Sequence, residues 1–198
     1  MTEFGDEWWE AVDAALSVGQ RIAPTKEDLN AGCEHVVRLL KDAAALLELG
    51  SYATAAFLSI TAIEETAKVH IGKYRRSAQQ APRRKDPLFK HEQKHKLGLG
   101  PTVSMGGRLK AAVGEDRLRE LTQLAQSGEL VALREAALYV EQKEKGLVVP
   151  AVAINPRLSR DLFLLAIEAF DDALVGYTNR SFELGAETDH LFEQWTKA

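Results

Sequence analysis

The residues with the clearest chemical potential lie in one short stretch, His91-Glu92-Gln93-Lys94-His95. It matches H-E-x-x-H, in which two imidazoles one helical turn apart bind zinc and the glutamate acts as general base. This pattern leads to one hypothesis, a zinc-dependent hydrolase that uses His91 and His95.

The third ligand is the weak point of the zinc hypothesis. A longer form of the motif would place it at Pro101, which cannot bind zinc, and lysines flank the motif on both sides and repel a dication. Glu115 or Glu120 could complete the site only from a distance along the chain. We therefore expect no metal and no other cofactor, and keep the zinc hydrolase as a lesser alternative.

The same histidines also suit chemistry on RNA without a metal. A histidine beside lysines and a carboxylate can move a proton between a ribose 2′-hydroxyl and a leaving 5′-oxygen, while the cations hold the phosphate. Exposed loop histidines without a function would show the same pattern. The candidate catalytic residues are Glu64, Glu65, Lys68, His91, Lys94 and His95.

Two carboxylates, Glu64 and Glu65, end the most apolar stretch of the chain, since residues 52–63 carry no charge. Glu64 and Lys68 are four residues apart, in the order that favours an ion pair on one helix face. An ordinary ion pair where a helix leaves the core would have this spacing too. The distance from these carboxylates to the two histidines therefore decides whether they form one functional cleft.

A basic segment surrounds these residues. Residues 68–96 contain ten Lys and Arg against two acidic residues, so the segment carries +8 and the rest of the chain −12, for a net charge of −4. One concentrated basic segment on an acidic body indicates a local anionic partner, although a solvated surface loop is the simpler alternative. The candidate substrate-binding residues are Arg75, Arg76, Arg84, Arg134 and Tyr139.

The composition limits the class of protein. The chain has 198 residues, 45% of them hydrophobic, which suits one domain over 1–198 with a proper core. Cys33 is the single cysteine, so no intramolecular disulfide forms. The N-terminus is acidic and lacks the pattern of a signal peptide, and no apolar run reaches membrane-spanning length. We expect a cytoplasmic protein without a membrane partner.

A helical framework must position the candidate residues, because apolar residues recur with the helical period over most of the chain. Pro82, Pro87 and Pro101 interrupt a long basic connection at about 77–103. We predict an all-α fold, an up-and-down bundle of about five main helices. The expected helices cover 6–16, 25–49, 51–76, 105–126, 130–145 and 155–184, with an extended link at 147–154 and a short turn around 191–195.

Three pieces of the chain resemble the AbiV-type abortive infection proteins of the HEPN superfamily. The helix that ends in residues 63–68, Ile-Glu-Glu-Thr-Ala-Lys, is similar to their A-I-E-E-x-x-K helix. Residues 89–94 are similar to their F-x-H-x-x-K segment, and residues 138–141, followed by Gly146 and Pro150, to their L-Y-V segment. The pieces occur in the family's order.

The resemblance implies a HEPN-like helical bundle, usually a homodimer, in a bacterial anti-phage protein. Many HEPN proteins are metal-independent ribonucleases with an R-x4-6-H motif. Here Arg84 and His91 have that spacing with Pro87 between them, and Arg134 has Tyr139 at the matching distance.

Two functions are compatible with this resemblance. In the first, the protein acts on RNA or translation in infected cells, for example as a metal-independent ribonuclease. In the second, it is a non-catalytic protein-binding inhibitor of translation that a phage protein triggers. The expected partners are accordingly RNA, the translation machinery or a phage protein.

Overall fold

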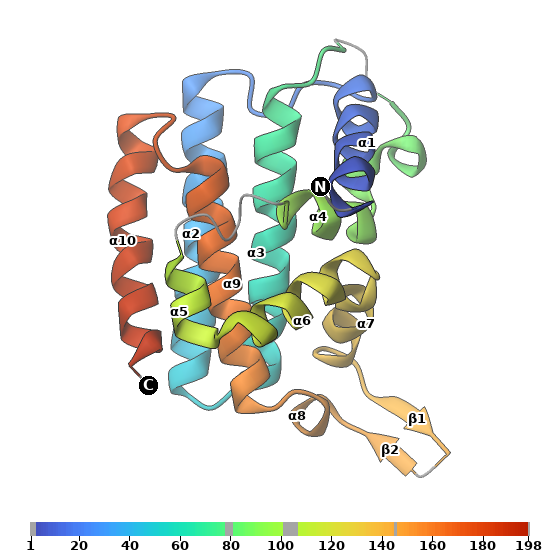
Figure 1. Cartoon of the computed structure of the whole chain (residues 1–198), viewed down its shortest axis with the longest axis vertical. Coiled ribbons are helices and arrows are strands. Elements are labelled where there is room, and N and C mark those ends of the chain that lie inside the picture. Colours follow the sequence, from blue (N-terminus) through green and yellow to red (C-terminus); the bar gives the residue numbers. More distant parts are fainter. Residues whose placement is uncertain (1–2, 78–80, 101–106, 145, 198) are drawn as a thin grey trace.

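The computed structural model describes residues 3–77, 81–100, 107–144 and 146–197. Four long helices lie side by side along the long axis of the molecule (Figure 1). These are α2 (Lys26–Glu48), α3 (Tyr52–Lys73), α9 (Pro156–Leu174) and α10 (Asn179–Thr196). The remaining helices are shorter and cover the side of α3 and α9 that α2 and α10 leave open. The predicted all-α fold is confirmed.

Helix α3 lies at the centre of the fold, where it packs against α2, α9 and α4 (His91–Gly98). Its first charged residue is Glu64, so the preceding three turns can be buried on all sides. Ser59 donates to the carbonyl of Ala55 at 2.8 Å, which satisfies a buried hydroxyl within the helix. Burial of this helix leaves the side chain of Glu64 only 2% exposed.

The α2–α3 hairpin follows local sequence signals. Thr25 and Asp28 form a capping box, with the Thr25 hydroxyl accepting from the Asp28 amide at 3.0 Å. Gly50 turns the chain at φ 72°, a left-handed conformation that suits glycine. The predicted ends of these helices at Thr25 and Gly50 agree with the structure. Ser51 precedes α3 but makes no side-chain cap.

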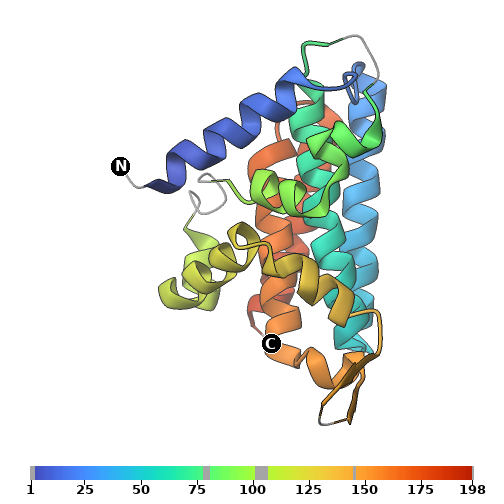
Figure 2. The ribbon, with the colours of Figure 1, turned by 90° about the vertical axis from the view of Figure 1, so that its right-hand side faces the viewer.

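A smaller apolar cluster joins the N-terminal helix to the basic connection. Helix α1 (Glu3–Ser17) packs there with the C-terminal part of α3, with the short 3-10 helix η2 (Pro87–Phe89) and with α4. A second short 3-10 helix, η1 (Arg83–Lys85), contacts η2. Figure 2 shows α1 leaning away from the long helices. The buried members of this cluster are Val12, Ala15, Ala67, Ile71, Leu88 and Leu97. The connection is therefore largely structured where it is described, with part of 77–103 outside the described residues.

The predicted helix over 105–126 is broken. The structure has α5 (Arg108–Val113) and α6 (Glu115–Gln126), separated by Gly114 at φ 88°. A glycine with positive φ ends one helix and starts the next at a new angle. The predicted start, at Met105, lies outside the described residues.

The predicted helix over 130–145 is wrong in its second half. Helix α7 covers only Glu129–Ala136, and the chain then forms a hairpin of β1 (Glu141–Lys143) and β2 (Gly146–Val148). Gly146 has φ 125°, a conformation outside the helical region that glycine adopts readily. Instead of the fully extended link, a short helix α8 (Pro150–Ala153) follows. The hairpin projects from one end of the molecule (Figure 2).

The predicted helix over 155–184 is two helices. Asn155 caps α9 as expected, accepting from the Leu158 amide at 2.8 Å. The chain then leaves the helical conformation at Val175 and turns at Gly176, φ 92°. Thr178 caps α10, which takes in the residues expected as a short final turn. The described ranges hold ten α-helices, of which α1, α2, α3, α9 and α10 are the longest, so the total differs from the predicted count of about five main helices through the short helices.

Candidate functional site

One buried carboxylate organises the candidate site. The side chain of Glu64 projects from α3 toward α4 and contacts three α4 residues. His91 Nδ1 lies 2.8 Å from Oε2, Lys94 Nζ lies 2.6 Å from Oε2, and His95 Nε2 lies 2.9 Å from Oε1. Four of the six candidate catalytic residues therefore meet within hydrogen-bond distance.

Helix α4 presents these three donors because of their spacing. Positions 91, 94 and 95 are separated by three and four residues, which places their side chains on one helix face. Asp86 accepts from the Leu88 amide at 3.0 Å and so caps the turn that leads into α4. Gly98 lets α4 approach α3 closely, because a Cβ there would lie 2.9 Å from the Ile63 carbonyl oxygen.

A fourth cation reaches Glu64 from α7. Arg134 Nε lies 3.5 Å from Oε1 of Glu64, and the guanidinium lies over the ring of Phe57, 4.6 Å from its centroid. Arg134 Nε is buried and makes no hydrogen bond to any described residue. The single negative charge of the carboxylate thus faces two positive charges, those of Lys94 and Arg134.

The environment keeps Glu64 ionised. Burial alone would raise the pKa of its carboxyl and is the largest single influence. Hydrogen bonds from His95 and Lys94, together with their charges, outweigh it and lower the pKa from 4.5 to about 2. An ionised carboxylate only accepts hydrogen bonds, so both imidazole nitrogens that face it must carry their protons.

The two histidines differ in access. His95 is fully buried, and its Nδ1 has no hydrogen-bond partner among the described residues. The side chain of His91 is 45% exposed. Because its Nδ1 donates to Glu64, its Nε2 is the unprotonated nitrogen in the neutral ring and is free to accept a proton from a substrate. A carboxylate that orients an imidazole in this way is a recurrent arrangement for general base catalysis.

The sequence of this chain matches one known protein family over most of its length. The HEPN_AbiV family, described as AbiV, matches residues 27–169. This chain belongs to the AbiV family. The matched residues include α3, α4 and α7, and therefore the whole Glu64 cluster. No curated protein and no solved structure matches the chain.

Membership of the AbiV family makes this an abortive-infection, HEPN-like protein. No helix within the described ranges combines the length and the apolar character needed to cross a membrane. The homodimer that the resemblance implies stays a prediction, as does the cytoplasmic location.

Lys68 pairs with Glu65, and not with Glu64 as its spacing predicted. Lys68 Nζ lies 2.9 Å from Oε2 of Glu65 and does not pair with Glu64. The Glu64 side chain points into the α3–α4 interface, where its partners come from α4. Lys68 therefore pairs with Glu65, three positions before it. The Lys68 ammonium also lies 5.8 Å from the ring centroid of Phe89.

The candidate substrate-binding residues of this AbiV protein do not form one group. Arg75 lies within the fold, where its guanidinium pairs with Asp86 and donates to the Ala15 carbonyl at 3.0 Å. It is buried, so its observed role is structural and it is not open to a substrate. Arg76 and Arg84 are exposed. Tyr139 is exposed beyond the end of α7, outside the Glu64 cluster.

The geometry gives the zinc hypothesis no support. Glu92, the general base of the H-E-x-x-H pattern, points away and pairs with Lys96 at 3.0 Å. Both histidines direct a nitrogen to Glu64, where the Lys94 ammonium already supplies a cation. Within the part of the chain that the structure describes, no group of three or more His, Cys, Asp or Glu side chains is arranged to hold a metal ion.

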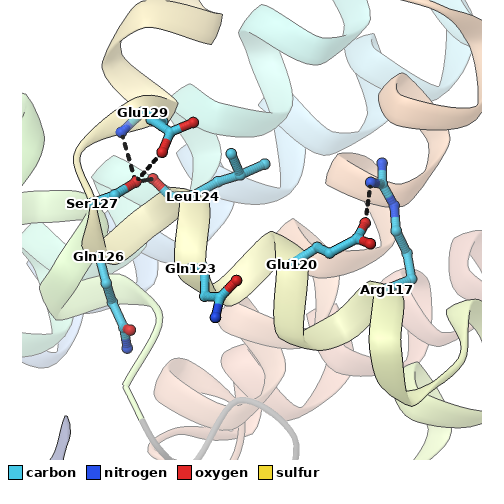
Figure 3. Close-up of a pocket in the computed structure, with 7 residues that line it drawn as sticks. All are labelled: Arg117, Glu120, Gln123, Leu124, Gln126, Ser127 and Glu129. Atoms are coloured by element: carbon cyan, nitrogen blue, oxygen red, sulfur yellow. Dashed lines mark hydrogen bonds and ion pairs between the residues drawn. The ribbon is translucent and has the colours of Figure 1, made fainter.

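A pocket of about 620 Å³ lies elsewhere, along α6 (Figure 3). None of the candidate catalytic residues lines it. Arg117 pairs there with Glu120 at 2.9 Å, and Ser127 with Glu129 at 2.9 Å (Figure 3). With two carboxylates and one guanidinium, this pocket does not favour an anionic substrate.

Sequence reasoning missed the ion pairs that connect distant helices. Arg108 of α5 contacts Glu168 and Asp171 of α9 and Asp189 of α10. The sequence offers no local signal for these contacts, since the partners lie at least 60 residues apart.

Proposed function

We propose that this AbiV-family protein acts on RNA in phage-infected bacterial cells, with His91 as the residue that moves the proton. The observation that carries the proposal is the hydrogen bond from His91 Nδ1 to the buried, ionised carboxylate of Glu64. It orients a half-exposed imidazole and leaves Nε2 as the proton acceptor. Glu64 is then a positioning residue, and His95 and Lys94 hold it in place.

The proposed reaction needs no metal. His91 Nε2 takes the proton from a ribose 2′-hydroxyl, and the 2′-oxygen attacks the adjacent phosphorus. The bond from phosphorus to the 5′-oxygen breaks, and the histidinium returns the proton to that oxygen. The products are a 2′,3′-cyclic phosphate and a 5′-hydroxyl end, so atoms and charges balance.

Groups beside His91 suit an RNA strand. Phe89, two residues earlier, is partly exposed, and the side chains of Lys68 and Arg83 lie 5.8 and 5.1 Å from its ring centroid. An RNA base can stack on such a ring, and the cations beside it can neutralise the phosphates of the RNA backbone. Arg134 adds a charge that Glu64 does not fully neutralise.

The test is cleavage of RNA by the purified chain in the presence of a chelator. We expect products with 2′,3′-cyclic phosphate ends, and a loss of 100-fold or more in rate for His91→Ala, a typical contribution of general acid–base catalysis on the order of 10²–10⁴. His190→Ala, an exposed histidine of α10, is the matched control and should cleave like the wild type.

The same pair of variants should be tested against phage. Cells that carry His91→Ala should lose protection while His190→Ala cells keep it. Intact RNA with wild-type protein, or equal cleavage by the wild type and His91→Ala, would show that the catalytic assignment is wrong.

A second candidate function is inhibition of translation by binding a phage protein or the translation machinery, without catalysis. It is favoured by the exposed apolar side chains around the β1–β2 hairpin, which projects from the bundle (Figure 2). Exposed apolar groups of this kind are typical of protein-binding surfaces. They are Leu138, Tyr139, Val140, Leu147, Val149 and Val152.

The two candidates predict different variants to be inactive. Leu147→Glu places a charge on the hairpin and should abolish protection if a protein partner binds there, with RNA cleavage unchanged. If protection instead depends on His91 and survives Leu147→Glu, the RNA-directed function is favoured.

A further inference from the structure

A second surface pocket has an unusual charge. It lies where the α1–α2 connection, the C-terminal end of α3 and the α9–α10 turn meet, and has a volume of about 510 Å³. Arg21, Lys26 and Lys73 line it, and no Asp or Glu does. The residues that the argument uses are Arg21, Lys26, Lys73, Tyr74, Tyr177 and Thr178.

The cations of this pocket are not neutralised. Arg21, Lys26 and Lys73 make no ion pair with any residue of the described ranges, although the chain as a whole is acidic. Three other pockets on the described surface are each lined by at least one carboxylate. A concave site with three unpaired cations and no acid attracts small anions strongly.

Two tyrosine rings fix the position of one of these cations. The Lys73 ammonium lies 3.2 Å from the ring centroid of Tyr177 and 5.0 Å from that of Tyr74. The two hydroxyls are hydrogen-bonded to each other at 2.7 Å. Burial and the Tyr74 hydroxyl raise the pKa of Tyr177 to about 12, so the Tyr177 hydroxyl stays neutral and does not repel an anion. Both rings are 40% or more exposed and can contact a ligand.

Helix termini of both kinds meet at this pocket. Thr25 and Thr178, the N-caps of α2 and α10, line it together with Tyr74, the C-cap of α3, so the helix dipoles offset one another and the positive charge comes from the three side-chain cations. The side chain of Ala23, also in the lining, is attached to a backbone at φ 51°, which costs an alanine about 1 kcal/mol.

The pocket is separate from the Glu64 cluster. Lys73 follows Glu64 by nine residues on α3, about 14 Å along the helix and half a turn around it. The two sites therefore face opposite sides of the central helix, and one small ligand cannot occupy both.

We propose that this pocket binds a small phosphorylated organic ligand, with its phosphate at Arg21, Lys26 and Lys73 and its organic part on the rings of Tyr74 and Tyr177. A volume of about 510 Å³ is of the size that holds a small molecule. Phosphate is a chemical group that three unpaired cations bind well, and exposed rings favour a planar or sugar group attached to it. This goes beyond the RNA-directed function and does not depend on it.

The test is calorimetric titration of the full chain with inorganic phosphate, ribose 5-phosphate and AMP. We expect ribose 5-phosphate and AMP to bind and to raise the melting temperature through binding linkage. Arg21→Ala/Lys73→Met should weaken this binding tenfold or more. Arg38→Ala, an exposed arginine on α2 outside the pocket, is the matched control and should bind like the wild type.

The outcomes separate the parts of the proposal. No binding of any probe, or equal binding by the wild type and the double variant, overturns it. Binding of inorganic phosphate as tight as that of the two organic phosphates would overturn the role of the tyrosine rings. His91→Ala should bind the probes normally, so a failure of the RNA-directed function leaves this result unaffected.

Discussion

Two charge clusters in this protein have opposite compositions. In the Glu64 cluster, one buried carboxylate faces Lys94, Arg134 and two imidazoles. In the Arg108 cluster, one guanidinium faces the carboxylates of Glu168, Asp171 and Asp189. The first connects α3 to α4 and α7, and the second connects α5 to α9 and α10.

The difference lies in what each cluster leaves unsatisfied. All three nitrogens of the Arg108 guanidinium donate to carboxylates, so this cluster has more negative than positive charge. Its observed role is to hold α5 against α9 and α10. The Glu64 cluster has a surplus of cations and an imidazole nitrogen that faces outward. A surplus of positive charge beside a proton acceptor favours an anionic substrate, whereas a fully paired cation favours a structural role.

The largest expected effect is that of removing the Glu64 carboxylate. Glu64→Leu leaves Lys94 and Arg134 without their buried counterion, and we expect it to lower the free energy of unfolding by roughly 3–5 kcal/mol. Urea denaturation measures this. Glu65→Leu, at the half-buried neighbour that pairs with Lys68, is the control and should cost less than about 1 kcal/mol. Equal losses would remove the distinction between the two glutamates.

The charge of Glu64 should also appear in the pH dependence of stability. Its pKa falls from 4.5 to about 2 on folding, so its stabilisation is complete above pH 4.5 and is lost as the pH falls toward 2. Glu64→Gln should therefore be less stable than the wild type by roughly 3 kcal/mol at pH 7. The gap should narrow below pH 4.5 in thermal or urea unfolding; a constant gap would show that charge is not the cause.

Removing the cation of the opposite cluster should have a smaller effect. Arg108→Met leaves Glu168 buried beside Asp171, but the guanidinium is partly exposed, so we expect a loss of about 2 kcal/mol. Arg119→Met, whose ion pairs are fully at the surface, should change stability by less than about 0.5 kcal/mol. RNA cleavage should survive in Arg108→Met if the cluster is only structural.

The smallest effect is expected at Asp172, beside the Arg108 cluster. Burial, followed by the charge of Glu168, raises the pKa of its carboxyl from 3.8 to about 6, with Arg108 opposing. Above pH 6 the charged form is penalised in the folded state, and below pH 3.8 the penalty is absent. Asp172→Asn should stabilise the protein at pH 7 by less than about 1 kcal/mol, because much of the side chain is exposed and solvent screens the penalty. It should have no effect at pH 3.5.

Local signals allowed part of the fold to be predicted from the sequence. The α2–α3 hairpin was predictable because Thr25, Asp28 and Gly50 act on residues within one helical turn of themselves. The helix breaks at Gly114 and Gly176 could not be predicted from the sequence. A glycine within an apolar periodic stretch is compatible with a continuous helix until packing requires a turn. The β1–β2 hairpin was missed for a related reason, since short apolar runs suit strand and helix alike.

The candidate site was predictable in its members and not in its pairing. Glu64, His91, Lys94 and His95 were proposed from residue types, spacing and resemblance, and they do meet. The pairing of Lys68 with Glu65, and the burial of Arg75 with Asp86, follow from which side chain each helix directs inward. The phosphate pocket at Lys73 was not predicted, because its lining comes from three separate connections.

By itself, the sequence determined the helical class, the caps of α2 and α9, the acidic body with one basic segment, and the residues able to do chemistry. These properties depend on neighbours within about one helical turn or on composition alone. Only the tertiary structure decided that Glu64 is buried against residues 27 to 31 positions later. Electrostatic energies change steeply over a few ångströms and with burial, so the role of each charge was set by the packing of α4 and α7 against α3.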